Sequence, residues 1–357
     1  MSTPTAIPRT QRAAVVTKFS GPVQIQTDYP VIDPAELKPG YCLVRMSVSG
    51  VCHSDLHIKD GEWPGAVLPL VGGHEGVGTI VAMGAGTPDS DHVKLGSKVG
   101  IKWTADACGR CELCRSGNEP SCLKTKSSGF TMNGTFSEYV VAAVNHVVPI
   151  PDGLEDHIAA PTLCAGLTVY RGLKVSNTKV GEWVVLPGAG GGLGHMAVQY
   201  AVAMGLRVVA IDTGDDKRDM CLRRGAEKWI DFKKSTNVVE DVKAVTGGLG
   251  PHAAVITSPM STAYEQAFQY LRPTGTLVAI GLPTGYSLSH PLAGIVSKSL
   301  RIVGSNVGNF QDAVEALDLV QRGKVQAHIT LRKLEDLDDI FQEMSEGKLV
   351  GRAVVQF

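Results

Sequence analysis

The chain has 357 residues, of which 43% are apolar and 19% charged, a balance that is typical of globular proteins and excludes a disordered chain. A chain of this length can form two ordinary domains, each with its own core. The 34 Lys and Arg residues nearly balance the 35 Asp and Glu residues, so no excess charge favours nucleic acid or an anionic membrane as a partner. No uninterrupted apolar run reaches the roughly 20 residues of a membrane-spanning helix.

The N-terminal segment is basic and has no acidic residue before Asp28, a composition that organelle transit peptides share. Pro4 and Pro8 interrupt this segment and Ala13–Val16 predicts a first strand, so we expect a short tail rather than a cleaved leader. Because no secretory hydrophobic segment is evident, we predict a cytoplasmic protein whose eight cysteines stay reduced.

Residues 1–165 show short strand-like runs separated by Gly and Pro, which predicts an irregular, mostly β domain. The clearest runs are Cys42–Val48, Gly78–Met83, Lys98–Ile101 and Glu138–Val141.

The next part of the chain, residues 166–305, alternates between apolar strands and helical segments. Six strands joined by right-handed crossovers form a doubly wound parallel sheet, so we predict an α/β Rossmann domain. The expected strands are Trp183–Leu186, Leu206–Asp212, Lys228–Asp231, His252–Thr257, Thr276–Ile280 and Leu300–Val303, and the expected helices are 195–204, 216–224, 238–246 and 261–271.

The tail, residues 306–357, contains a predicted helix at Asp312–Gln321 and a predicted strand at Arg352–Gln356. We expect this segment to return to the first domain and complete it.

Four cysteines give the strongest local signal, because Cys108, Cys111, Cys114 and Cys122 lie within 15 residues of one another in a polar loop. Such spacing fits a closed tetrahedral zinc site, since this polar segment could not bury four free thiols. An iron–sulfur cluster uses similar spacings and remains an alternative.

A second possible metal site is spread along the chain at Cys52, His74 and Cys164. Taken singly, a buried cysteine is more often an apolar filler, and a lone histidine is more often a hydrogen-bonded core residue. Spacing alone does not join these three residues.

Four segments in their order along the chain resemble the zinc-containing medium-chain alcohol dehydrogenases, specifically the tetrameric yeast and fungal branch. They are Gly50-Val-Cys-His-Ser-Asp-Leu-His57, Leu70-Val-Gly-Gly-His-Glu-Gly76, Cys164-Ala-Gly-Leu-Thr168 and Val350-Gly-Arg-Ala353. The resemblance extends from about Ala6 to Phe357. It implies a GroES-like fold for the β-rich domain, a homotetramer, two zinc ions per chain and NAD-linked oxidation of small primary alcohols.

The resemblance also assigns roles around the second metal site. Cys52, His74 and Cys164 would bind the catalytic zinc, and Glu75 would be a carboxylate that can approach the metal. Asp55 would fix the tautomer of His74. A proton from the alcohol would pass to Ser54, then through a ribose hydroxyl of the cofactor to His57 and solvent. A zinc ion held by two thiolates and an imidazole acts as a Lewis acid, which fits this chemistry independently.

A glycine-rich loop follows the first strand of the predicted Rossmann domain and reads Gly188-Ala-Gly-Gly-Gly-Leu-Gly194. It lacks the G-x-G-x-x-G pattern but matches a spaced form at Gly188, Gly191 and Gly194, which resembles the fungal enzymes. Such a loop before a helix lets the backbone approach a pyrophosphate, so Gly192 and Leu193 are also expected to bind the cofactor.

Cofactor choice is expected to depend on Asp212, at the end of the next strand. A carboxylate there accepts hydrogen bonds from ribose hydroxyls and repels a 2′-phosphate, which favours NAD over NADP. By resemblance, Lys217 also reaches this ribose, while His53 and Arg352 would contact the pyrophosphate. For Arg352 the alternative is an ordinary surface charge.

The substrate pocket is predicted from the same resemblance. Trp63 and Trp103 correspond to aromatic residues that narrow the pocket of ethanol-oxidising fungal enzymes, although both could be ordinary core residues. Thr168 and Leu282 would line the same pocket. Two indoles leave room for ethanol and short primary alcohols, and less for branched or aromatic ones.

Three alternative hypotheses about the function remain. The first is an NADPH-dependent aldehyde or cinnamyl-type reductase on the same fold. The second is a zinc module that binds nucleic acid, against which the balanced charge argues. The third is a non-catalytic Rossmann protein that keeps only the four-cysteine zinc site.

Overall fold

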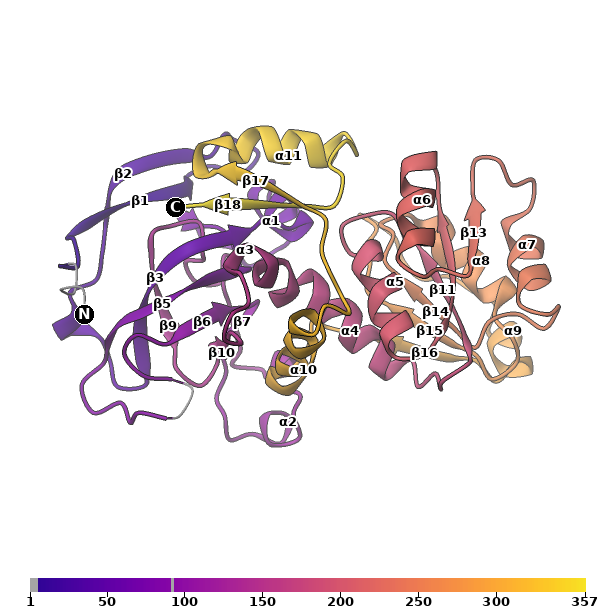
Figure 1. The fold of residues 1–357 in the computed structure, drawn as a ribbon, viewed down its shortest axis with the longest axis horizontal. Coiled ribbons are helices and arrows are strands. Elements are labelled where there is room, and N and C mark those ends of the chain that lie inside the picture. Colours follow the sequence, from indigo (N-terminus) through magenta and orange to yellow (C-terminus); the bar gives the residue numbers. More distant parts are fainter. Residues whose placement is uncertain (1–5, 91–92) are drawn as a thin grey trace. The chain divides into compact units, whose positions relative to one another are not determined.

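The computed structural model describes residues 6–90 and 93–357, so the first residues of the predicted N-terminal tail lie outside the described part. The chain folds into two compact units, which Figure 1 shows. The first unit contains the residues up to Cys164 together with Asn309–Leu317 and Ile329–Phe357. The second contains Ala165–Gly308 and Asp318–His328. The expected return segment 306–357 is therefore divided, because residues 318–328 belong to the second unit.

The first unit is built around a seven-stranded sheet. Six of its strands follow one another in the order β10-β6-β5-β3-β18-β17, and the seventh, β9, also pairs with β3. A three-stranded sheet (β2-β1-β4) and a two-stranded sheet (β7-β8) accompany it. The strands are β1 (Thr10–Val16), β2 (Gln24–Pro30), β3 (Tyr41–Gly50), β4 (Leu70–Val71), β5 (Gly76–Met83), β6 (Lys98–Ile101), β7 (Thr104–Asp106), β8 (Lys126–Ser127), β9 (Tyr139–Ala143), β10 (Val148–Pro149), β17 (Ile329–Lys333) and β18 (Arg352–Gln356).

Alternating side chains form the core of this sheet, because successive residues of a strand point to opposite faces. Cys42, Val44 and Met46 of β3 lie in one buried apolar cluster with residues of β5, β6 and β9. The C-terminal strand β18 pairs antiparallel with the end of β3, where Val354 lies opposite Gly50. The last residues of the chain are thereby built into the first unit, as Figure 1 shows for the yellow strand.

Short helical segments connect these strands, and a nine-residue helix packs on the core. The helix α11 (Leu337–Ser345) buries Leu337, Ile340, Phe341 and Met344, the spacing of one helical face. The other helical segments are η1 (Pro34–Glu36), α1 (His53–Lys59), α2 (Glu112–Arg115), η2 (Glu119–Ser121), α3 (Asp156–Ala159), η3 (Ala160–Leu163) and η4 (Leu334–Asp336). The helix α10 (Phe310–Gln321) begins in the first unit and ends in the second.

The second unit contains a six-stranded parallel sheet in the order β13-β12-β11-β14-β15-β16. Numbered along the chain this order is 3-2-1-4-5-6, the arrangement of a Rossmann fold. Its strands are β11 (Trp183–Pro187), β12 (Arg207–Asp212), β13 (Lys228–Asp231), β14 (Ala253–Ile256), β15 (Thr276–Ala279) and β16 (Arg301–Gly304), and its helices are α4 (Ala165–Val175), α5 (Gly194–Ala203), α6 (Asp215–Arg223), α7 (Val238–Val245), α8 (Ser261–Tyr270) and α9 (Leu292–Ser297).

The predicted fold class is confirmed, and most predicted strands lie within two residues of their observed bounds. The sequence pattern did not predict the helices α4, α9 and α11, nor several short strands and helices of the first unit, β2 and β17 among them. The first strand begins at Thr10 rather than Ala13, because its polar start pairs with β2. None of the helices in residues 6–90 and 93–357 combines the length and apolar character needed to cross a lipid bilayer.

Candidate metal centres and cofactor loop

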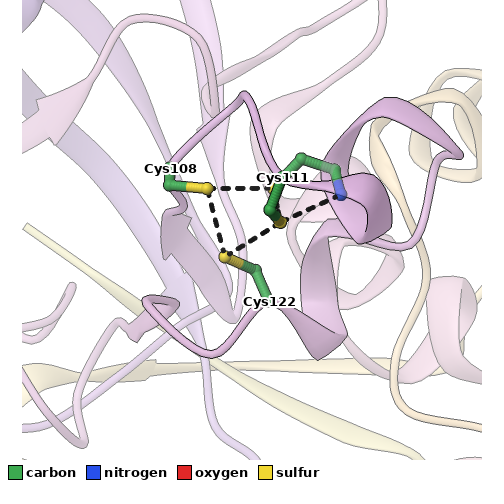
Figure 2. Close-up of side chains that lie close together, drawn as sticks. Cys108, Cys111 and Cys122 are labelled. Carbon is green, nitrogen blue, oxygen red and sulfur yellow. Dashed lines mark hydrogen bonds between the residues drawn. The ribbon is translucent and has the colours of Figure 1, made fainter.

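The four cysteines of the loop around α2 converge on one point, as Figure 2 shows for Cys108, Cys111 and Cys122. Four sulfurs around one zinc ion at about 2.3 Å would lie about 3.8 Å from one another in a tetrahedron. The measured Sγ–Sγ distances are 3.9 Å for Cys108–Cys114, 3.5 Å for Cys111–Cys114, 3.8 Å for Cys111–Cys122 and 3.6 Å for Cys122–Cys108. The donor set and its spacing therefore fit a closed zinc site.

Backbone N–H groups lie against two of these thiols, those of Cys108 and Cys122, and favour their ionised form, whereas burial raises the pKa of Cys114 to about 12. The N–H groups of Arg110 and Cys111 lower the pKa of Cys108 to about 6. The amide of Lys124 lies 3.4 Å from the sulfur of Cys122, whose pKa is also lowered by backbone N–H groups. Because metals bind the thiolate, the loop is prepared to hold a cation.

A second cluster forms in the first unit from three separate segments. Cys52 caps the start of α1, His74 follows β4, and Cys164 follows η3. One ligand atom from each of these residues and one from Glu75 lie within 4.8 Å of one another. The two sulfurs are 3.9 Å apart, again the separation expected for two thiolates on one zinc ion. All four residues are buried.

Asp55 connects the segments that carry this second cluster. Asp55 is the third residue of α1, and its carboxylate accepts the N–H of Cys52 at 2.9 Å. This hydrogen bond is one of the two that make up a capping box. The carboxylate also accepts the N–H of Gly73 at 3.1 Å and lies 3.0 Å from Nδ1 of His74. Nε2 of His74 is buried and has no hydrogen-bond partner among the described residues, which leaves it available to a metal ion.

The electrostatics of the second cluster also suit a cation. A hydrogen bond from Cys164 lowers the pKa of Cys52 well below its usual range, and His74 and Arg352 lower it further. Burial by itself would lower the pKa of His74, but the charges and hydrogen bonds of Asp55 and Cys52 together outweigh burial, so the pKa is raised. Two sulfurs, one imidazole and a nearby carboxylate are the donors that zinc prefers, so the residues fit this metal.

Glu75 forms a buried ion pair with Arg352, which β18 brings to the cluster from the far end of the chain. Burial raises the pKa of Glu75 to about 7, although the charge of Arg352 opposes the rise. A Cβ at position 50 would lie 2.0 Å from Oε2 of Glu75, so only glycine fits there. Arg352 is only 3% exposed, so the alternative of a surface charge is wrong, while its contact with a pyrophosphate stays a prediction.

The residues of the predicted proton path and two of the predicted pocket residues, Trp63 and Trp103, lie in the first unit near this cluster. Oγ of Ser54 lies 3.7 Å from the sulfur of Cys52. The ring of His57 stacks on Trp63, with centroids 5.7 Å apart, and lies 5.5 Å from the ring of His53. Trp63 meets Trp103 edge-on at 5.9 Å.

Trp103 also makes an edge contact with the ring of His74 at 5.1 Å. The sequence did not point to two neighbours of this group. Phe130 stacks on Trp103 at 5.7 Å, and Glu62 lies 2.8 Å from Nδ1 of His57. Phe130 stands 27 residues from its partner in an ordinary turn, so only the fold reveals it. Glu62 stands only five residues from His57, so its closeness in sequence to the predicted proton path could have pointed to it.

In the second unit the glycine loop connects β11 to α5. Gly188 has a φ of 81°, a left-handed conformation that favours glycine. A Cβ on Gly194 would lie 2.0 Å from the carbonyl oxygen of Gly188, so the close turn requires glycine there as well. Gly191 and Gly192 complete the loop, and Leu193 stands before the first turn of α5.

Asp212 at the end of β12 is tied to the same loop. Its carboxylate accepts the N–H of Gly190 at 2.9 Å and the N–H of Thr213 at 2.8 Å, and it pairs with Lys217 at 3.3 Å. The glycine turn and the helix start that follows it fit the pyrophosphate of a dinucleotide. The carboxylate of Asp212 fits an adenosine ribose without a 2′-phosphate. Thr168 is buried in α4 and Leu282 is exposed after β15, and their place in the substrate pocket stays a prediction.

The fold and the donor sets together define a dehydrogenase with a Rossmann unit and a zinc-binding unit. The family model described as alcohol dehydrogenase GroES-like domain matches residues 38–152, and the model described as zinc-binding dehydrogenase matches residues 192–322. An alcohol dehydrogenase of Schizosaccharomyces pombe is 44% identical, covering 98% of both chains, and alcohol dehydrogenase 1 of Emericella nidulans is 45% identical, covering 98% of this chain and 99% of its own.

Solved structures agree. Acetophenone reductase from Geotrichum candidum in complex with NAD has a TM-score of 0.86 at 28% identity, covering 99% of both chains. The alcohol dehydrogenase of Aeropyrum pernix has a TM-score of 0.87 at 29% identity, covering 97% of this chain and 100% of its own. The chain belongs to the zinc-containing medium-chain alcohol dehydrogenases, and it is an enzyme that interconverts alcohols and carbonyl compounds.

Proposed function

We propose that the enzyme oxidises small primary alcohols, ethanol first among them, to aldehydes with NAD as hydride acceptor, and that it catalyses the reverse reaction. The convergence of Cys52, His74 and Cys164 carries this proposal. A zinc ion bound there would supply the Lewis acidity that lowers the pKa of an alcohol. The four-cysteine loop would hold a second, structural zinc ion, which gives two per chain.

The remaining steps use side chains of the first unit. Ser54 stands beside Cys52 and accepts the proton of the alcohol. His57 is three residues further along α1, on the same helix face, and takes the proton onward to solvent. Asp55 keeps His74 and Cys52 in place, so the ligand geometry does not have to form during the reaction.

A narrow pocket supports short substrates. Trp63 and Trp103 meet edge-on, and Trp103 lies against the ring of His74. Indole rings are large and rigid, so two of them beside the metal ligands leave little width for branched or aromatic alcohols.

The preference for NAD rests on Asp212. Its carboxylate is held by three donors, the N–H groups of Gly190 and Thr213 and the ammonium group of Lys217. This carboxylate is negatively charged, as the 2′-phosphate of NADP is. Two like charges at hydrogen-bonding distance repel each other, so NADP is expected to bind weakly.

We also propose a homotetramer in a reducing compartment, the cytoplasm. The edge strand β16 exposes Ile302, and the neighbouring helix α9 exposes Leu292 and Val296. An apolar sheet edge of this kind pairs with another chain unless it is covered, which supports association with a second copy. None of the eight cysteines, which all lie among the described residues, forms a disulfide bond, as expected in a reducing compartment.

A steady-state assay with ethanol, hexanol and cinnamyl alcohol, each with NAD and NADP, tests the proposed function. We expect the highest kcat/KM for ethanol with NAD. A clear preference for cinnamyl alcohol with NADP would instead support the reductase. Metal analysis should find two zinc ions per chain, whereas a single ion in an inactive protein would support the non-catalytic alternative. Sedimentation at several protein concentrations tests the tetramer.

A further inference from the structure

His195 stands immediately after the glycine loop, as the second residue of α5, and its side chain is buried. Both ring nitrogens contact backbone groups. Nδ1 lies 2.9 Å from the carbonyl oxygen of Gly191, and Nε2 accepts the N–H of His328 at 3.1 Å. Because a carbonyl can only accept and an amide N–H can only donate, these partners assign a neutral ring with its hydrogen on Nδ1.

The carbonyl of Gly191 is therefore held by two donors, since it also accepts the backbone N–H of His195 at 3.0 Å. In a trans peptide the C=O group and the following N–H point in opposite directions. Holding the Gly191 oxygen toward the body of α5 aims the N–H of Gly192 out of the start of the helix. That is the side on which the N-terminal amides of a helix bind an anion.

The second bond of His195 ties the loop to residues that come more than a hundred positions later. One turn along α5, Gln199 makes a parallel set of contacts. Its amide donates to the carbonyls of His195 at 2.8 Å and Gln326 at 3.1 Å, and its oxygen accepts the N–H of Gln326 at 2.9 Å. Both side chains thus hold residues 326–328 against α5. Of the two, only His195 also binds the glycine loop.

We infer that His195 is a positioning residue for the cofactor: it fixes the peptide between Gly191 and Gly192 so that the loop presents an N–H, and not a carbonyl oxygen, to the pyrophosphate. This role rests on the proposed function, in which NAD is the ligand of the loop. A carbonyl oxygen turned toward the phosphates would repel them. A loop without the hydrogen bond from His195 to the carbonyl of Gly191 is therefore expected to bind the dinucleotide less well.

Three variants separate this role from a general effect on the helix. His195→Leu fills a similar space without hydrogen bonds, and His195→Gln can still donate to the carbonyl four residues earlier, as Gln199 does to His195. Gln199→Leu is the matched control, because it removes the contact with Gln326 and leaves the bond to Gly191 in place. The measurements are the Kd for NADH by fluorescence titration, kcat, the KM for NAD and for ethanol, and the unfolding temperature.

We expect His195→Leu to raise the Kd for NADH and the KM for NAD about ten-fold, the effect of losing one hydrogen bond that orients a binding group, with the KM for ethanol unchanged. His195→Gln should stay near the unmodified enzyme in both quantities. Gln199→Leu should lower the unfolding temperature and leave the Kd for NADH as it was. Should the Leu variant not fold, His195→Ala carries the same expectation.

An unchanged Kd in the Leu variant, or equal weakening by His195→Leu, His195→Gln and Gln199→Leu, would overturn the positioning role while the enzyme still turned over ethanol with NAD. If the unmodified enzyme bound no NADH, the proposed function itself would fail, and the role of His195 with it.

Discussion

Asp55→Asn is a sharp test of how the second cluster is held together. The carboxylate of Asp55 receives the N–H of Cys52 and the N–H of Gly73 and lies 3.0 Å from Nδ1 of His74. Asparagine has almost the same shape but only one acceptor oxygen. Whichever way the amide turns, its NH2 group faces at least one N–H that needs an acceptor.

The expected magnitude follows from burial. The side chain of Asp55 is 1% exposed, so water does not replace a lost partner. A buried donor without a partner costs about 1–3 kcal/mol, which should appear as a lower free energy of unfolding. Removing a carboxylate that supports a metal-binding histidine weakens metal binding by about 10–100-fold.

The assay is zinc content per chain after equilibration with increasing concentrations of a chelator. The four-cysteine site serves as an internal reference, because none of its ligands contacts Asp55. We expect the variant to lose one zinc ion at a chelator concentration at which the unmodified enzyme keeps two. Asp338→Asn is the matched control, since Asp338 also accepts a backbone N–H, from Val23 at 3.1 Å, but on the surface. Equal zinc retention and equal stability in both variants would refute the reasoning.

Three further outcomes are expected. Cys52→Ala should reduce the zinc content from two ions to one and abolish turnover, with the far-UV circular dichroism spectrum unchanged; an active variant would contradict the ligand assignment. Asp212→Gly should lower the preference for NAD over NADP in kcat/KM by about ten-fold or more, as the loss of one charged hydrogen-bonding group predicts. Gly50→Ala should destabilise the protein by about 1–3 kcal/mol in chemical denaturation, because the new methyl group overlaps Glu75, whereas Gly304→Ala, with nothing within 4 Å, should be nearly neutral.

The β-rich unit was harder to predict in detail than the Rossmann unit. A parallel sheet buries both faces of each strand, so β11, with all five residues buried, appears in the sequence as a continuous apolar run. The helix α11 of the β-rich unit was not predicted, although it has a clear apolar face with Leu337, Ile340, Phe341 and Met344 buried. The Rossmann unit also contains a helix that was not predicted, α9, which buries no residue and so has no apolar face to mark it in the sequence.

The burial of Arg352 rules out the alternative of a surface charge, which the local sequence had left open. An arginine near the C-terminus has a surface position as its default, since charged side chains are rarely buried without a partner. Its partner, Glu75, lies 277 residues earlier, and strand β18 brings the two together. No pattern of spacing could have joined them.

The four-cysteine loop and the strand–loop–helix repeat were determined by the sequence itself, because their members lie within one short segment or recur with a regular period. The position of Asp212 beside the glycine loop was predictable for the same reason, as it stands at the end of the next strand, while its role in cofactor choice stays a prediction. The tertiary structure alone decided that Cys52, His74 and Cys164 share one buried point, that Arg352 neutralises Glu75, and that His195 reaches His328. The physical reason is that these groups meet only after sheets pair and cores pack, and packing brings distant residues together without leaving a periodic trace along the chain.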